Sequence, residues 1–177
     1  MNIIILGVAG SGKTTVGREL AARLGAEWRF VDADAFHPAA NIEKMSRGLP
    51  LDDADRAPWL AALAAHLDAC AARGEEVVLA CSALKEAYRR QLARSRAATR
   101  FVFLKGDAAT LDARLRGRRG HYMKAPMLRS QLATLEEPAP DAALVVDATL
   151  PPGEVVARIL RGLGLPARRE DSSPRQP

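Results

Sequence analysis

Residues 7–15, GVAGSGKTT, combine glycines with a lysine and two threonines in the pattern G-x-x-x-x-G-K-[ST]. The apolar run IIIL at 3–6 stands directly before them and predicts a strand that leads into the loop. Glycines let several backbone N–H groups turn toward one anion, and a helix that begins there adds the positive end of its dipole. Lys13 would then reach the β- and γ-phosphates, and the Thr14 hydroxyl would ligate Mg²⁺. A glycine turn that binds nothing would not need this Lys-Thr pair, so the stretch predicts ATP or GTP binding.

A second group of polar residues, DADAFHP, begins at Asp32, about twenty residues after the loop. We expect Asp32 and Asp34 to end the second strand on one face, at the edge where ligands bind in open α/β sheets. One carboxylate would hold a Mg²⁺-bound water, and the other would orient an attacking hydroxyl or accept its proton. The alternative is a pair of turn aspartates before a helix whose first turn Pro38 favours. His37 would contact the acceptor or bond a neighbouring carbonyl.

Strand-like and helix-like segments alternate along the chain, and the strand-like runs are almost continuously apolar. This pattern is typical of a parallel sheet covered by helices on both faces, which places the chain in the α/β class. We expect one domain over residues 1–165 and a disordered, polar, proline-rich tail over 166–177. The expected strands are 3–6, 28–34, 77–81, 101–104 and 144–146, and the expected helices are 12–24, 56–73, 84–94, 107–117 and 152–163.

The composition favours a small anionic ligand over a nucleic acid. The chain has 177 residues, a net charge of +5 and a pI near 9.7, but its arginines are scattered and aromatic residues are only 5%. No segment approaches the ~20 apolar residues of a membrane span. Cys70 and Cys81 lack metal-ligand spacing, which indicates reduced thiols. We therefore expect a soluble cytoplasmic protein that binds neither nucleic acid nor membrane.

Beyond the loop, four longer blocks resemble the gluconate kinases (gluconokinases), which are small P-loop metabolite kinases related to shikimate kinase. With the loop, these blocks span most of residues 3–147. Three positions depart from the family pattern: Ala93 stands in place of arginine, and Tyr122 and Leu132 in place of phenylalanine. The blocks are DADAFHPAANIEKMSRGLPLDDADRAPWL (32–60), CSALKEAYRRQLA (81–93), FLKGDAATLDARLRGRRGHYM (103–123) and LRSQLATLEEP (128–138).

The resemblance implies ATP-dependent phosphorylation of D-gluconate at its 6-hydroxyl, giving 6-phosphogluconate and ADP. It also implies the P-loop NTPase fold, with a five-stranded parallel sheet in the order 2-3-1-4-5, a mobile lid and a homodimer. Reasoning from the residues alone reaches a kinase of a small hydroxylated acid. A shikimate-kinase-like enzyme is the alternative, although its glycine-triplet loop is missing here and CSALK follows the third strand instead.

An acid substrate needs a cation for its carboxylate. Arg56 is the first choice because a guanidinium fork matches a carboxylate. The alternative for Arg56 is a local ion pair with one of the aspartates at 52, 53 and 55. Lys85 and Arg89 would either bind the substrate or form a solvated helix face at i, i+4.

The stretch RLRGRRGH at 114–121 gathers four arginines and a histidine around two glycines. Glycines suit a segment that hinges, and cations suit one that closes over phosphates, so we expect the lid at about 114–126. Arg114 and Arg118 would stack on adenine and touch the transferring phosphoryl group. A basic helix end or a nucleic-acid patch is the alternative.

The expected site residues form four groups. They are, for catalysis, Lys13, Asp34 and Arg118; for ATP, Gly7, Val8, Ala9, Gly10, Ser11, Gly12, Lys13, Thr14, Thr15 and Arg114; for the substrate, Asp34, His37, Arg56, Lys85, Arg89 and His121; and for Mg²⁺, Thr14 and, through water, Asp32.

Overall fold

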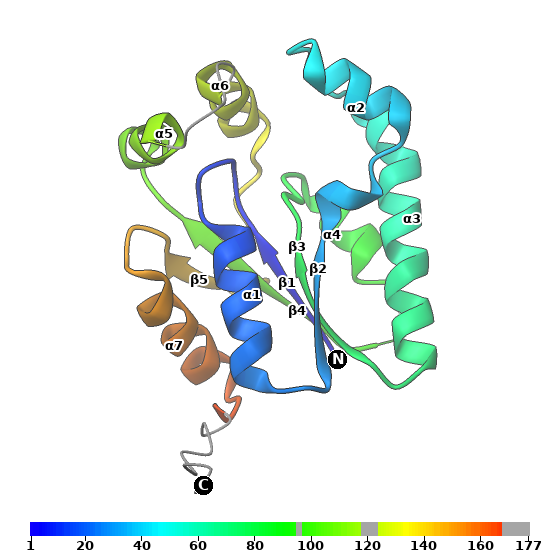
Figure 1. The fold of residues 1–177 in the computed structure, drawn as a ribbon, viewed down its shortest axis with the longest axis vertical. Helices are drawn as coiled ribbons and strands as arrows, with labels where there is room; N and C mark the ends of the chain where they lie inside the picture. The colour runs from blue at the N-terminus through cyan, green and yellow to red at the C-terminus, as the bar shows by residue number, and fades with distance from the viewer. Residues whose placement is uncertain (95–96, 118–123, 168–177) are drawn as a thin grey trace, which may run out of the picture.

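Five parallel strands form one sheet in the order β2-β3-β1-β4-β5 (Figure 1). The structure, a computed structural model, describes residues 1–94, 97–117 and 124–167. The observed order confirms the expected five-stranded P-loop NTPase sheet. The strands are β1 (Asn2–Leu6), β2 (Trp28–Asp32), β3 (Glu76–Ala80), β4 (Thr99–Lys105) and β5 (Leu144–Asp147).

Helices cover both faces of the sheet, and the side chains of β1 explain why. All five residues of β1 are buried, and alternate ones point to opposite faces. Ile3 and Ile5 belong to the apolar cluster beneath α1 (Lys13–Leu24) and α7 (Pro152–Leu163). Ile4 and Leu6 belong to the cluster on the other face, beneath α3 (Asp53–Ala72) and α4 (Glu86–Leu92).

A third apolar cluster lies at the carboxyl ends of the strands, beside the glycine loop. Here α5 (Ala108–Gly117) and α6 (Lys124–Thr134) pack together above the loop, and α2 (Ala39–Ser46) stands at the far side of the same edge (Figure 1). The cluster ties the loop to both helices and to the segment after β3. Its buried members are Val8, Leu84, Leu111, Leu115 and Leu128.

The second strand is shorter than expected. It ends at Asp32, and residues Ala33–Phe36 form a short 3-10 helix, η1. The expectation that Asp34 belongs to the strand is therefore wrong. The physical reason is local: an Asp32 carboxylate oxygen accepts a hydrogen bond from the Asp34 N–H at 3.2 Å, which turns the chain immediately after the strand.

The remaining elements agree with the expected alternation, with two additions. Neither α2 nor α6 was among the five helices expected from apolar spacing. In the three described ranges, no helix is both long and apolar enough to cross a membrane. The expected tail falls mainly on 168–177, which lie outside the described residues.

Candidate active site

The glycine loop has a backbone that requires its glycines. Gly7, Gly10 and Gly12 have φ values of 149°, 83° and 90°, in the region that side chains disfavour. A Cβ at Gly10 would lie 2.9 Å from the carbonyl oxygen of Leu111, so the loop also packs tightly on α5. Gly12 caps α1 without a side-chain hydrogen bond, which leaves the first N–H groups of that helix to an anion.

Polar side chains complete the loop. The Lys13 ammonium group donates to the carbonyl oxygen of Val8 at 3.1 Å, so it lies back over the loop. The buried Ser11 hydroxyl has no hydrogen-bond partner in the described part of the chain. Thr15 lies exposed in the first turn of α1. The loop thus presents a cation and polar groups around one backbone turn, which suits phosphate oxygens.

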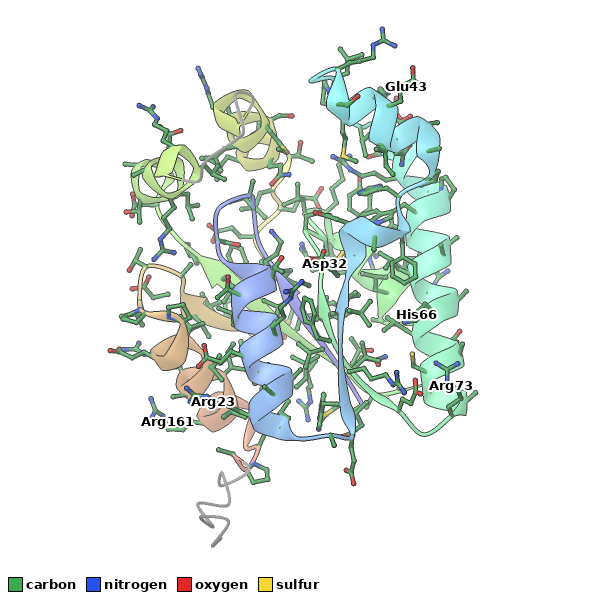
Figure 2. The ribbon with its side chains drawn as sticks, viewed as in Figure 1. Arg23, Asp32, Glu43, His66, Arg73 and Arg161 are labelled. Atoms are coloured by element: carbon green, nitrogen blue, oxygen red, sulfur yellow. The ribbon has the colours of Figure 1, made fainter. Side chains whose placement is uncertain are left out.

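Thr14 and Asp32 meet across the gap between α1 and β2. The Thr14 hydroxyl donates to a carboxylate oxygen of Asp32 at 3.1 Å, and Figure 2 shows Asp32 at the carboxyl end of β2, beside the start of α1. A hydroxyl and a carboxylate are hard oxygen donors, which fit Mg²⁺. The structure therefore brings together the two residues that the sequence predicted for Mg²⁺, and their binding of the ion stays a prediction.

Asp34 lies next to this pair with its carboxylate unengaged. The side chain is exposed, and within the described ranges it makes no hydrogen bond or ion pair. The segment that carries it is nevertheless anchored, because the buried indole of Trp59 donates to the carbonyl oxygen of Ala33 at 2.7 Å. Trp59 is thus a core residue that holds the backbone of this segment. An anchored backbone with a free carboxylate suits a group that must meet a substrate hydroxyl.

His37 packs on the same tryptophan. The two rings stack with centroids 4.5 Å apart and an interplanar angle of 10°. Burial lowers the pKa of His37 below its usual value, against the opposing effect of Asp34. Asn41 is buried, and Lys44 is paired with the Asp55 carboxylate.

The cationic groups of Arg56 and Lys85 both lie over the Tyr88 ring, each 5.8 Å from its centroid. Lys85 donates to both carboxylate oxygens of Asp53 at 2.8 Å, and this bond lowers the pKa of Asp53. Arg56 donates to the Tyr88 hydroxyl at 3.4 Å and makes no ion pair with a described carboxylate. The local ion pair that was the alternative for Arg56 is therefore absent from the described part of the chain. The binding of a substrate carboxylate by Arg56 stays a prediction.

Arg89 is placed beneath the site. It is 5% exposed, and its guanidinium donates to the carbonyl oxygens of Ala83 and Leu84 at 3.0 and 3.1 Å. The alternative that Arg89 lies on a solvated helix face is therefore wrong. This placement favours a supporting role for Arg89 over the expected contact with a substrate. The segment that it holds, residues 81–85, contains a strained backbone, since Ala83 has a φ of 37°.

Reasoning from residue types missed two residues that contact the site, one in α6 and one just after its end. The side-chain oxygen of Gln131 accepts from the backbone N–H of Ala9 at 2.6 Å. Glu136 receives the N–H of Glu86 at 2.7 Å, and its own N–H donates to Leu84. Both residues belong to the block LRSQLATLEEP that carried the family resemblance, but nothing in their types or spacing pointed to the glycine loop.

The expected lid is only partly visible. Arg114 donates to the backbone carbonyls of Ala148 and Thr149, the second at 2.9 Å, so its guanidinium lies at the turn after β5. Its contact with adenine stays a prediction. Arg118 and His121 lie outside the described residues.

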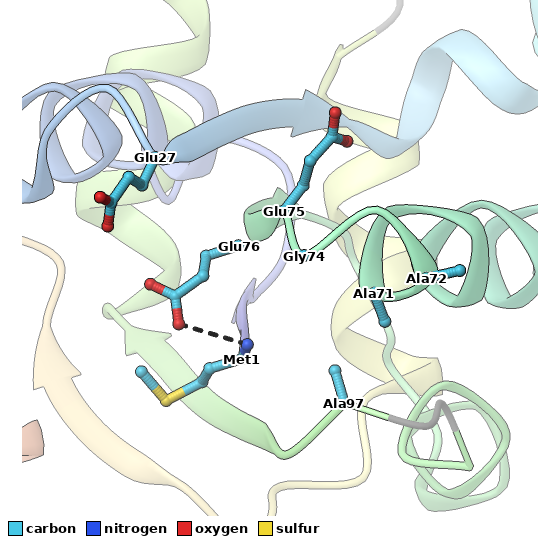
Figure 3. A pocket seen from close by; sticks show the side chains of 8 residues that line it. All are labelled: Met1, Glu27, Ala71, Ala72, Gly74, Glu75, Glu76 and Ala97. Carbon is cyan, nitrogen blue, oxygen red and sulfur yellow. Dashed lines mark hydrogen bonds and ion pairs between the residues drawn. The ribbon is translucent and has the colours of Figure 1, made fainter.

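A hollow of about 640 Å³ lies at the opposite edge of the sheet, away from these groups (Figure 3). Two of its three acidic side chains have partners. Glu76 contacts the amino group of Met1 at 3.4 Å, and Glu75 pairs with Arg29 and Arg73. The third, Glu27, is exposed, and no residue of the glycine loop or of the Asp32–Asp34 segment lines the hollow.

Comparison with known proteins agrees with this geometry. A family model described as an AAA domain matches residues 3–138. A gluconokinase of Gluconobacter oxydans is 46% identical over 160 residues, covering 90% of this chain and 89% of that protein. The chain belongs to the gluconokinase family. It is therefore a P-loop kinase, a phosphotransferase.

Solved structures give the same assignment. The crystal structure of a gluconokinase from Sinorhizobium meliloti matches with a TM-score of 0.83 and 43% identity, covering 92% of this chain and 91% of that one. A shikimate kinase from Aquifex aeolicus matches with a TM-score of 0.56 and 21% identity, covering 93% and 96%. The second likeness extends to the fold alone.

Proposed function

We propose that this chain transfers the γ-phosphoryl group of ATP to the 6-hydroxyl of D-gluconate, giving 6-phosphogluconate and ADP. One observation carries the proposal: the Asp34 backbone N–H is bonded to Asp32 of the Thr14–Asp32 pair, and the exposed Asp34 carboxylate has no partner in the described residues. A phosphate-binding loop and an unengaged carboxylate side by side are what an acceptor hydroxyl needs. The relatives named above supply the identity of the acceptor.

Positioning and charge neutralisation account for the catalysis. Lys13 would neutralise the β- and γ-phosphates of ATP. Thr14 and, through water, Asp32 would hold Mg²⁺, which supplies further positive charge to the phosphate oxygens. The substrate oxygen forms a bond to the γ-phosphorus as the bond to the ADP oxygen breaks, and Asp34 orients the hydroxyl and takes its proton.

The acceptor would be held by its charged end. Arg56 is a partly buried cation without a carboxylate partner in the described residues, which suits the carboxylate of gluconate. Lys85, already paired with Asp53, would contribute less. Arg118, which would touch the transferred phosphoryl group, and His121 would complete the proposed site from the lid.

We further propose that the protein is a cytoplasmic homodimer that binds neither nucleic acid nor membrane. Light scattering would measure the mass of the particle and so test the dimer.

ADP release with Mg-ATP would test the function, comparing gluconate, shikimate, AMP and no acceptor. A Lys13→Met variant is the control for contaminating kinases. We expect turnover on gluconate alone, since a site built to bond substrate hydroxyls rejects analogues by up to ~10⁴. Turnover on shikimate instead would keep a kinase and overturn the acceptor, and no turnover on any of them would overturn the proposal.

A further inference from the structure

The ring of His37 is held on two sides by different helices. Trp59 of α3 stacks against its face at 4.5 Å, and this indole is fixed by its own bond to Ala33. Asn41 of α2 meets its edge: the side-chain nitrogen Nδ2 of Asn41 lies 3.4 Å from Nδ1 of His37. The imidazole therefore has a fixed plane and a fixed neighbour at one of its two nitrogens.

The orientation of the Asn41 amide follows from a second contact. Its Nδ2 also lies 2.8 Å from the backbone carbonyl oxygen of Asp55, and a carbonyl oxygen only accepts hydrogen bonds. The NH₂ group must therefore occupy this position. Asn41 is 4% exposed, so water does not replace this bond. A buried amide with a single allowed orientation fixes the chemistry of whatever it faces.

The tautomer of His37 follows in turn. An amide NH₂ has no acceptor capacity, so Nδ1 of His37 must accept the bond from Asn41 and carries no proton. In the neutral ring the proton then sits on Nε2. Two charged groups influence the ring, Asp34 on η1 favouring the imidazolium and Arg56 on α3 opposing it. Burial is the largest influence and lowers the pKa of His37, which favours the neutral ring at neutral pH.

We propose that Asn41 is a positioning residue that holds His37 as the Nε2–H tautomer, so that His37 donates a hydrogen bond to an oxygen of the acid substrate. This inference rests on the proposed kinase function for its substrate, but the tautomer itself does not. It assigns His37 the role of donor and leaves Asp34 as the acceptor. A hydroxyl both donates and accepts, so a donor and an acceptor three residues apart suit a polyol.

Nitrogen-15 NMR of the free protein tests the tautomer without any substrate. The chain has three histidines, and a His37→Gln variant identifies the signals of His37. At neutral pH we expect Nδ1 to give the shift of an unprotonated nitrogen and Nε2 that of a protonated one. A proton on Nδ1, in either the other neutral tautomer or the imidazolium, would overturn the proposal.

A matched pair of substitutions tests the donor role. The side-chain NH₂ of Gln extends about as far as Nε2 of histidine, and that of Asn about as far as Nδ1. We expect His37→Gln to keep the KM for gluconate within a few-fold, and His37→Asn to raise it about tenfold, as the loss of one hydrogen bond predicts. The KM for ATP should stay unchanged in both. Equal losses in the two variants would contradict a donor at Nε2.

An Asn41→Asp variant tests the positioning role through its pH profile. A carboxylate at this position accepts from Nδ1–H, so deprotonation of the imidazolium would leave Nε2 without a proton. In the variant, the KM for gluconate should rise as the pH rises through the pKa of His37. The wild-type KM should show no step from this group, because both the imidazolium and the Nε2–H tautomer donate. A KM for gluconate that does not change with pH in a folded variant, verified by circular dichroism, would overturn the proposal.

The two proposals can fail separately. If the wild type does not phosphorylate gluconate at all, the kinase proposal fails, and the NMR result still decides the tautomer of His37.

Discussion

The side-chain oxygen of Gln131 lies 2.6 Å from the backbone nitrogen of Ala9, so α6 is hydrogen-bonded to the glycine loop itself. Val8 and Leu128 pack together in the same place. The position of the loop therefore depends on a helix whose first residues, from Lys124, belong to the expected lid. Through this contact, a movement of the expected lid would change the geometry of the glycine loop.

Two substitutions of Gln131 should separate the effect of losing the hydrogen bond from the effect of adding a negative charge beside the loop. Gln131→Leu leaves the Ala9 N–H without its acceptor, and we expect a loss of about 1–2 kcal/mol in the free energy of unfolding. Gln131→Glu restores an acceptor but puts a negative charge beside the loop, so stability should recover while the KM for ATP rises about five- to tenfold. Urea unfolding and ATP titration measure the two effects. Wild-type ATP affinity in the Glu variant would show that the phosphates bind away from Ala9.

Removal of the Asp34 carboxylate should affect turnover and spare nucleotide binding. Asp34→Ala should lower kcat about 10²–10⁴-fold, the usual contribution of a positioned acid or base. The Kd for ATP should change less than about twofold, because this carboxylate makes no bond within the described part of the loop region. The exposed Asp141→Ala is the matched control. Parallel losses of turnover and ATP affinity would instead make Asp34 a structural or metal-site residue.

Two neighbouring arginines on α4 should behave very differently. Arg89→Met removes the donor to the Ala83 and Leu84 carbonyls, and we expect a loss of about 2–4 kcal/mol in the free energy of unfolding. Arg90→Met removes only an exposed pair with Glu86 at 3.3 Å, which is worth less than about 0.5 kcal/mol. Urea denaturation of both variants measures the difference. Similar costs would mean that the buried bonds do not hold the 81–85 segment.

The buried thiol of Cys81 should make stability fall at alkaline pH. Burial raises the pKa of Cys81 from 9.0 to about 12. A raised pKa means that its contribution is fully present below the unfolded value and is lost as the pH rises from about 9 toward about 12. Between about pH 7.5 and about pH 10.5 the wild type should lose about 2 kcal/mol more than Cys81→Ala. Guanidinium unfolding at both pH values gives this difference, and identical slopes would contradict it.

The sequence predicted the local structure around the glycine loop well because its signals are local. The glycine loop, the strand before it and the helix after it occupy consecutive residues, and the expected helix 12–24 is observed as Lys13–Leu24. The sheet followed from alternation of apolar runs, since buried parallel strands need continuous apolar sequence. Its order came from the family resemblance.

The acceptor side could not be predicted in the same way because it depends on contacts between distant segments. Asn41 looks like a helix-surface residue until α3 places the Asp55 carbonyl against it. Lys85 and Arg89 have the spacing of one helix face, but α4 begins only at Glu86, so Lys85 is its N-cap and Arg89 turns inward. The turn at Asp34 depends on the Asp32 side chain, which accepts a hydrogen bond from the Asp34 N–H. The spacing of apolar residues carries no information about such a bond.

The glycine loop and the proposed acceptor side of the site are supported by different apolar clusters. Val8 of the glycine loop belongs to the cluster with α5 and α6, whereas Ala33 and Trp59, which support the acceptor side, belong to the cluster beneath α3. Residues 81–85 are a described segment that contributes to both. Evolution could therefore retune α2 and the start of α3 for a new acid while the nucleotide half stayed intact. Such a division of labour makes one scaffold reusable across a family of enzymes.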